Sequence, residues 1–216
     1  YFYKLLYKYL SFYIRPEDAI LEIHPQNNLL IRMFQTRKIA VVADEKTEHV
    51  GGVETLIHLH DIQPWRPDYI VLNGNIHYER DIQRFLEELH AVCEPATRIL
   101  ILYYSSLWKP LLRVADWLGL RTKTPEQNWI AHSDIDNLLL LAGFEPVRRD
   151  NRVLLPLYLP FLSQFVNRYL APLPLFRLFT MVNVLIARPV FPSEQIPKPS
   201  VSIVVLSPFA PKSLTF

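Results

Sequence analysis

Short, almost uninterrupted apolar runs alternate with longer stretches of helical periodicity along most of this chain. Runs such as "AILEI" and "RILILYY" contain few polar residues, which is typical of strands buried on both faces of a sheet. Strands that alternate with helices favour a parallel sheet covered by helices on both sides. The expected strands cover 19–23, 38–44, 54–59, 68–74 and 98–104, and the expected helices cover 1–13, 27–35, 46–53, 79–93, 107–120 and 132–144, the last with Ser133 as its N-cap.

The end of the chain changes character. The pattern predicts a strand over 145–156, short helices over 158–171 and 173–179, and a final strand over 180–190. Beyond Pro192, the stretch 193–200 is typical of a linker, and 201–207 is typical of a further strand with nothing left in the sequence to pair it. We therefore expect one domain over 1–190 and a separate segment over 191–216.

Composition excludes several functional classes. Half of the 216 residues are hydrophobic, so the chain can bury a full core. The net charge is only +2 and the Lys and Arg residues are scattered, which argues against nucleic-acid binding. The single cysteine, Cys93, excludes an intramolecular disulfide and fits a reducing compartment. No apolar run is long enough to span a bilayer, so we expect a cytoplasmic protein, with the inner face of a membrane as the alternative location.

The turn after the first expected strand is unusual. A strand, a short polar turn and an apolar helical pattern in this order are the layout of a nucleotide-binding unit, yet the turn "HPQNN" over 24–28 contains no glycine. Pro25 also withholds a backbone donor from the turn.

The order of elements over 1–190 resembles that of class I S-adenosylmethionine-dependent methyltransferases. In that family an acidic residue near the end of the first strand precedes a Gly-x-Gly-x-Gly loop. Glu22 matches the acid, whereas His24, Gln26 and Asn28 stand at the three glycine positions. The resemblance implies an α/β fold, Rossmann-like and doubly wound, with a mostly parallel sheet and an antiparallel last strand.

The resemblance also implies a set of cofactor-binding residues. Asp44, at the end of the second strand, matches the acid that accepts hydrogen bonds from the cofactor ribose. Asp61 is the nearest candidate for an acid beside the adenine, and Asn73 ends the fourth strand. Together with Glu22 and the turn over 24–28, these residues would hold S-adenosylmethionine.

Two hypotheses about function remain open, because the missing glycines favour an inactive protein whereas the retained Asp44 favours an enzyme. Each replacement of a glycine in a strained conformation costs on the order of 1–3 kcal/mol. A loss of about 3 kcal/mol weakens binding roughly a hundredfold. The first hypothesis is a methyltransferase with weakened cofactor binding that acts on a small molecule, a saccharide or a lipid-linked glycan. The alternative is an inactive pseudo-methyltransferase that serves as a binding or scaffolding module. For either, we expect weak or absent binding of S-adenosylmethionine.

Two further stretches suggest a partner domain. "NRVLLPLYLP" and "NRYLAPLP" resemble a subgroup of methyltransferases found beside family 2 glycosyltransferases. "PSVSIVVLS", over 199–207, resembles the opening strand of such a glycosyltransferase, although "PFAPKS" replaces the polar turn that should follow it. The resemblance implies that 191–216 begins a truncated glycosyltransferase-like segment.

Histidines supply two weaker candidates. His58 and His60 are two apart in an expected strand and therefore share a face, with Asp61 beside them, but the further ligands of a zinc hydrolase are absent and we expect no metal site. His77 follows the fourth strand and is a candidate general base near neutral pH. The alternative is a surface histidine that caps a helix.

Aromatic and apolar residues leave two more alternatives open. Tyr103, Tyr104 and Trp108 could line an acceptor site or pack over the sheet edge. The stretch 155–181 contains arginines, no acid and many Leu, Phe and Tyr residues. It could contact a membrane peripherally or cap the acceptor side of the sheet.

Overall fold

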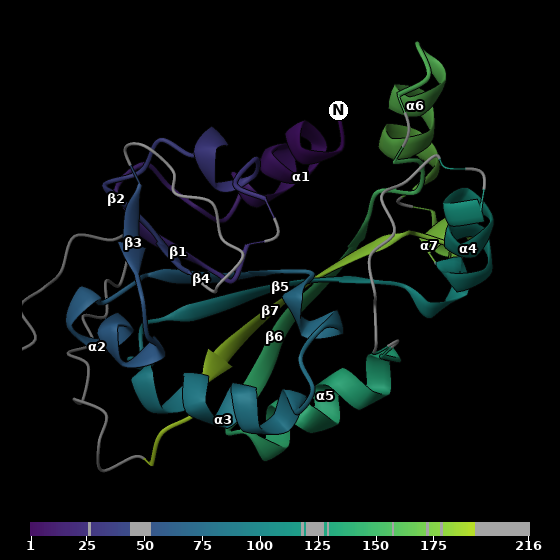
Figure 1. Cartoon of the computed structure of the whole chain (residues 1–216). Coiled ribbons are helices and arrows are strands. Elements are labelled where there is room, and N and C mark those ends of the chain that lie inside the picture. Colours follow the sequence, from purple (N-terminus) through teal and green to yellow (C-terminus); the bar gives the residue numbers. More distant parts are fainter. Residues whose placement is uncertain are drawn as a thin grey trace, which may run out of the picture.

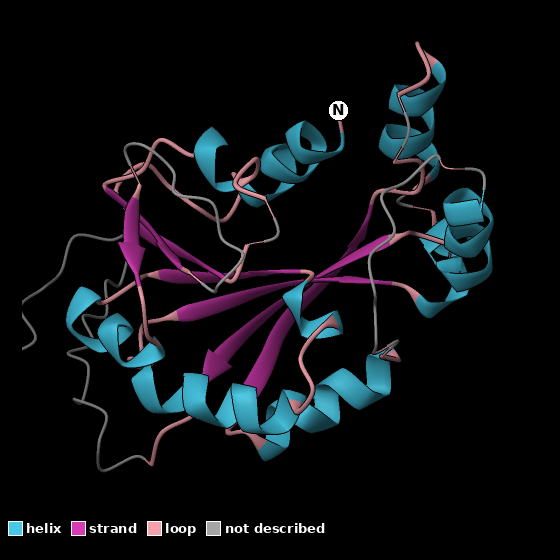
Figure 2. Cartoon of the chain, viewed as in Figure 1, coloured by secondary structure: helices cyan, strands magenta, loops and turns pink. Residues whose placement is uncertain are grey.

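A seven-stranded sheet forms the centre of the molecule (Figures 1 and 2). The strand order is β3-β2-β1-β4-β5-β7-β6, and among these strands only β7 runs against its neighbours. The expected mostly parallel sheet with an antiparallel last strand is therefore confirmed. The computed structural model describes residues 1–25, 27–43, 53–117, 119, 128, 130–156, 158–171, 173–177 and 179–192. The strands are β1 (Ala19–Ile23), β2 (Lys38–Val42), β3 (Glu54–Leu56), β4 (Tyr69–Asn73), β5 (Arg98–Tyr104), β6 (Phe144–Arg152) and β7 (Val182–Pro189).

The position of β1 creates a topological switch point. The chain passes from β1 to β2 on one side and later returns to pair β4 on the other side of β1. In open α/β sheets, ligands bind outside the carboxyl ends of the strands at such a point. A ligand-binding site is therefore expected at the carboxyl ends of β1 and β4.

Helices cover both faces of the sheet. Alternate strand residues point to opposite faces, so Leu21 and Ile70 pack toward helices α3 and α5, whereas Ile20 and Val71 pack toward α1. Burial on both faces explains why all of β1 is apolar except Glu22. The helical elements are α1 (Phe2–Leu10), η1 (Ile31–Met33), η2 (Leu59–Asp61), α2 (Ile62–Trp65), η3 (Asn75–His77), α3 (Ile82–Val92), η4 (Ser106–Trp108), α4 (Lys109–Trp117), α5 (His132–Leu141), α6 (Leu162–Phe165), η5 (Val166–Leu170) and α7 (Pro174–Arg177).

Three local expectations are wrong. In place of a helix over 27–35 the chain makes turns and the short η1, because the side-chain oxygen of Asn27 accepts a hydrogen bond from the backbone N–H of Leu29 and competes with helix formation. Ser133 is not the N-cap of α5. Ala131 holds that position, and the carboxylate of Asp134 accepts a hydrogen bond from its backbone N–H.

The third wrong expectation concerns β3, which ends at Leu56, so His58 and His60 do not lie on a strand. The expected helix over 46–53, apart from Val53, and the expected strand over 201–207 lie outside the described residues.

The C-terminal strands pair as the pattern predicts. β6 and β7 are antiparallel neighbours, and the short helices α6 and α7 lie between them in sequence. β6 ends earlier than expected because Val153 takes a left-handed φ of 51°, which a strand cannot continue. Among the described residues, no helix has both the length and the apolar character needed to cross a membrane.

Candidate functional site

Glu22 is a buried carboxyl group at the switch point. It lies near the end of β1, its side chain is fully buried, and its Oε1 accepts a hydrogen bond of 3.0 Å from Nδ2 of Asn73 at the end of β4. Burial raises the pKa of Glu22 to about 7, against the lowering effect of the Asn73 hydrogen bond. Among the described residues, Oε2 of Glu22 has no hydrogen-bond partner. The sequence-predicted pair of Glu22 and Asn73 is thus brought together, with one carboxyl oxygen available to a further group.

His24 begins the turn after β1 in a backbone conformation suited to glycine. Its φ is 42°, and its backbone N–H donates to the carbonyl of Val42 at 3.0 Å. Nδ1 of its ring lies 3.6 Å from Oε1 of Glu79, within ion-pair distance when the imidazole is protonated. The first position of the turn after β1 is therefore filled by a side chain that reaches the segment after β4.

A second contact joins the same two segments. Nδ2 of the buried Asn75 donates to the carbonyl of Ile23 at 3.3 Å. The end of β1 and the turn after it are thus tied to the end of β4 and the segment after it by three contacts. These join Glu22 with Asn73, the carbonyl of Ile23 with Asn75, and His24 with Glu79. Glu79 could not be identified from the sequence, because nothing in its polar surroundings distinguishes it from a solvated residue.

His77 is buried, contrary to the expectation of a surface histidine. Its Nε2 accepts a hydrogen bond of 2.9 Å from the backbone N–H of Tyr104, so the ring hydrogen lies on Nδ1, which is 2.7 Å from the carbonyl of Asn128. The ring also stacks on that of Tyr104, with centroids 5.3 Å apart. Both ring nitrogens are engaged with backbone groups, so the geometry does not support a general-base role.

The other residues predicted to bind the cofactor do not all lie beside Glu22 and Asn73. The carboxylate of Asp61 accepts a hydrogen bond from the backbone N–H of His58 at 3.0 Å and lies 3.3 Å from Nε2 of His60, so it stabilises its own turn. Asn28 is buried. Gln26 and Asp44 lie outside the described residues, and their predicted roles stay predictions.

The two histidines near Asp61 are arranged for stacking. The rings of His58 and His60 have centroids 5.1 Å apart. Within the part of the chain that the structure describes, no three His, Cys, Asp or Glu side chains are grouped to hold a metal ion.

The three aromatic residues at the end of β5 do not share one surface. Tyr103 is buried in the cluster that faces α3 and α5, and burial raises its pKa to about 12. Tyr104 and Trp108 pack in the cluster on the opposite face, where the indole N–H of Trp108 donates to the carbonyl of Phe179 at 2.7 Å. This arrangement favours packing over an acceptor site.

Several solved structures with similar folds are methyltransferases. A SAM-dependent methyltransferase from Thermotoga maritima superposes with a TM-score of 0.60 at 12% identity, covering 87% of this chain and 90% of that one. An S-adenosylmethionine-dependent methyltransferase from Mesorhizobium loti gives 0.53 at 15% identity, with 84% and 96% covered. The 1,6-didemethyltoxoflavin-N1-methyltransferase of Burkholderia thailandensis, solved with bound S-adenosylhomocysteine, gives 0.55 at 15% identity, with 88% and 79% covered. Neither protein-family models nor curated proteins give a match. The chain has the class I methyltransferase fold.

Proposed function

We propose that this domain is a pseudo-methyltransferase, a methyltransferase fold that serves as a binding or scaffolding module. The observation that carries the proposal is the contact between His24 and Glu79, 3.6 Å apart, which joins the turn after β1 to the segment after β4. In the resembling family, bare glycine backbone in this turn lets the cofactor approach closely. Here a Cβ and an imidazole occupy the first of those positions.

Other residues in and beside the turn also disfavour binding of the cofactor. Asn28 brings a second side chain to a former glycine position, and Pro25 removes a backbone donor from the turn. The contact of Asn75 with Ile23 further restrains the turn relative to the segment after β4. The residues present do not fit S-adenosylmethionine in the manner of the glycine loop.

A second candidate function is favoured by Glu22. A fully buried carboxyl group with one oxygen that no described residue satisfies is costly, and a ligand that donates to Oε2 would offset that cost. Asn73 holds the carboxyl group in place. The second candidate is therefore a methyltransferase that binds S-adenosylmethionine weakly. A saccharide or lipid-linked glycan as its acceptor is proposed from the sequence resemblance alone.

The partner is proposed from the sequence resemblance. The segment over 191–216 resembles the start of a family 2 glycosyltransferase, so a module of the proposed kind would hold such a domain or its glycan substrate. Co-purification of the methyltransferase-fold chain with a glycosyltransferase domain of the same organism would test this partnership.

Calorimetric titration with S-adenosylmethionine tests the two candidate functions. The native chain should give no binding heat at millimolar ligand. His24→Gly, which removes the side chain at φ 42°, should bind about tenfold more tightly or become measurable. Arg66→Gly is the matched control, because Arg66 also has a positive φ, of 53°, but ends the distant helix α2 and should leave binding unchanged. Low-micromolar binding by the native chain would overturn the pseudo-methyltransferase proposal in favour of the enzyme.

A further inference from the structure

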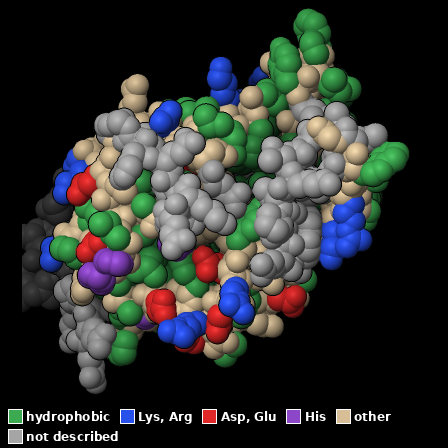
Figure 3. All heavy atoms as spheres, viewed as in Figure 1, with side chains coloured by type: hydrophobic (Ala, Val, Ile, Leu, Met, Phe, Trp, Pro, Cys, Tyr) green, Lys and Arg blue, Asp and Glu red, His purple; other side chains and the backbone are tan. Residues whose placement is uncertain are grey.

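The segment between β6 and β7 exposes an unusual number of large apolar side chains. We call its described residues over 158–179 the C-terminal arm; it comprises α6, η5 and α7. Figure 1 shows α6 projecting away from the sheet, and Figure 3 shows hydrophobic side chains gathered over this projection. Phe161 is 91% exposed and Leu175 is 67% exposed. The other exposed apolar residues of the arm are Tyr158, Leu159, Leu162, Phe165, Tyr169, Leu173 and Phe179.

Helix α1 lies against the arm and extends the same surface. The rings of Tyr1 and Tyr158 have centroids 5.3 Å apart, and Nδ2 of Asn167 donates to the hydroxyl of Tyr1 at 3.3 Å. The hydroxyl of Tyr9 donates to the carbonyl of Asn167 at 3.5 Å. These contacts hold α1 beside the arm, so side chains of both segments border the same region of the molecular surface.

The two segments that form this surface contain basic residues and no acidic ones. Neither 1–16 nor 153–181 contains an Asp or Glu residue. Lys4 and Lys8, one helical turn apart on α1, are exposed, as is Arg168 on the arm. Among the described residues, none of these three side chains forms an ion pair. The positive charge is therefore available to an anionic partner.

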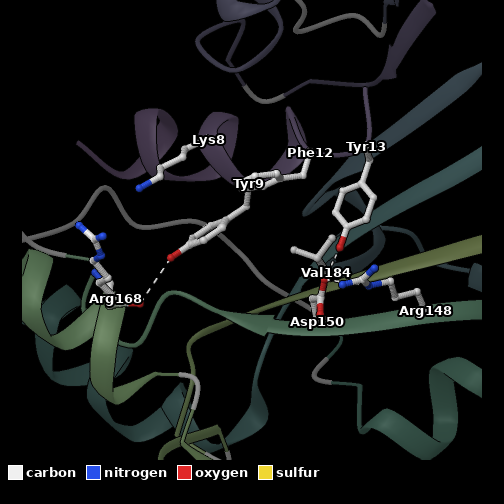
Figure 4. A pocket seen from close by; sticks show the side chains of 9 residues that line it. Lys8, Tyr9, Phe12, Tyr13, Arg148, Asp150, Arg168 and Val184 are labelled. Carbon is white, nitrogen blue, oxygen red and sulfur yellow. Dashed lines mark hydrogen bonds and ion pairs between the residues drawn. The ribbon is translucent and has the colours of Figure 1, made fainter. Parts of the chain in front are cut away.

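A cleft of about 490 Å³ lies between α1 and the arm. Lys8 and Arg168 line it, and Figure 4 shows their charged ends on the same side of the cleft. The acid in its lining, Asp150, forms an ion pair with Arg148 at 3.2 Å, which offsets its charge, and also accepts a hydrogen bond from the hydroxyl of Tyr13. The cleft has the size and charge to receive a phosphate group.

We propose that α1 and the C-terminal arm together bind the surface of an anionic lipid bilayer. The exposed rings would enter the interfacial region, Lys4, Lys8 and Arg168 would attract the headgroups, and the cleft would accept a headgroup phosphate. A second copy of the chain is a poorer occupant, because self-association through this surface would bring like charges together. The alternative function of the arm, covering the acceptor side of the sheet, does not explain why the side chain of Phe161 is exposed to solvent. The inference does not depend on whether S-adenosylmethionine binds.

Vesicle flotation with the whole chain tests the proposal. The chain should float with vesicles of phosphatidylcholine containing about 30% phosphatidylserine, bind vesicles of phosphatidylcholine alone much more weakly, and dissociate as NaCl is raised. Each basic residue near an anionic surface contributes about 1 kcal/mol, or about fivefold in partitioning, so replacing Lys4, Lys8 and Arg168 by Gln should reduce partitioning about a hundredfold. Phe161→Ser combined with Leu175→Ser should reduce it about tenfold or more.

Matched variants on other surfaces serve as controls. Ile57 and Leu141, which are 71% and 67% exposed, replaced by Ser should leave partitioning unchanged. The same holds for replacement of the exposed Arg66, Arg80 and Arg84 by Gln. Absence of flotation, equal binding to neutral and anionic vesicles, or equal effects of the control variants would overturn the proposal. So would concentration-dependent dimerisation abolished by Phe161→Ser, because it would identify a second copy as the occupant.

Discussion

The backbone N–H of Tyr104 donates a hydrogen bond of 2.9 Å to Nε2 of His77, so a buried imidazole supports the end of β5. The same ring contacts the carbonyl of Asn128 through Nδ1. One side chain thus joins the segment after β4 to the end of β5 and to a residue far along the chain. The arrangement assigns His77 a role in folding stability.

Replacement of His77 should therefore destabilise the protein. His77→Ala leaves the Tyr104 N–H without its acceptor and opens a cavity, which should lower the free energy of unfolding by about 2–4 kcal/mol. Urea denaturation measures this change. His60→Ala is the matched control, because His60 is exposed and its loss should change stability by less than about 0.5 kcal/mol. Equal effects of the two substitutions would contradict the structural role of His77.

The raised pKa of Glu22 predicts that stability depends on pH. The unfolded carboxyl has its ordinary pKa of 4.5 and the folded one about 7, so between these values the folded state binds more protons. Stability should therefore fall as pH rises, by about 2 kcal/mol between about pH 5.5 and about pH 8.

Glu22→Gln should remove that part of the pH dependence, because Gln carries no charge and its oxygen can still accept from Asn73. Urea denaturation at the two pH values measures the difference. Glu17→Gln is the control, since Glu17 is exposed and the slope of stability against pH should remain that of the native chain. An unchanged slope in Glu22→Gln would refute the assignment.

The glycine that ends α5 is predicted to be intolerant of a side chain. Gly143 has φ of 81°, and a Cβ there would lie 3.0 Å from Nε2 of His90, whose ring contacts the carbonyl of Val190. Gly143→Ala should lower the free energy of unfolding by about 2–3 kcal/mol.

Gly119→Ala separates backbone strain from the steric clash. Gly119 has φ of 68°, and no described atom lies within 4 Å of a Cβ built there. Its substitution should cost about 1 kcal/mol through backbone strain alone. Thermal unfolding of both variants gives the comparison, and a Gly119→Ala cost as large as that of Gly143→Ala would contradict the clash.

The start of α3 depends on a side-chain cap. Oδ1 of Asp81 accepts a hydrogen bond from the backbone N–H of Arg84 at 3.0 Å. Asp81→Ala should therefore cost about 1 kcal/mol of stability in urea denaturation, while Asp81→Asn, which keeps the acceptor, should cost only a fraction of that. Equal losses in the two variants would show that the cap is not the source of the effect.

The elements that could be predicted are those defined by local pattern. β1 and β5 have the predicted bounds, because a strand buried on both faces requires a continuous apolar run. The pairing of β6 with β7 was also predicted, although β6 itself is mostly polar and only β7 is mostly apolar. The turn over 27–35 could not be predicted, because its hydrophobic spacing matched a helix while the side chain of Asn27 bonded to the backbone instead.

The sequence alone determined the α/β class, most strand positions and the absence of glycine from the turn after β1, since these depend on which residues are neighbours along the chain. Only the tertiary structure decided how His24 approaches Glu79, why the pKa of Glu22 rises to about 7, and that His77 is buried. Those properties depend on segments that folding brings together from distant parts of the sequence. Desolvation and side-chain contacts act through space, and no local pattern records them.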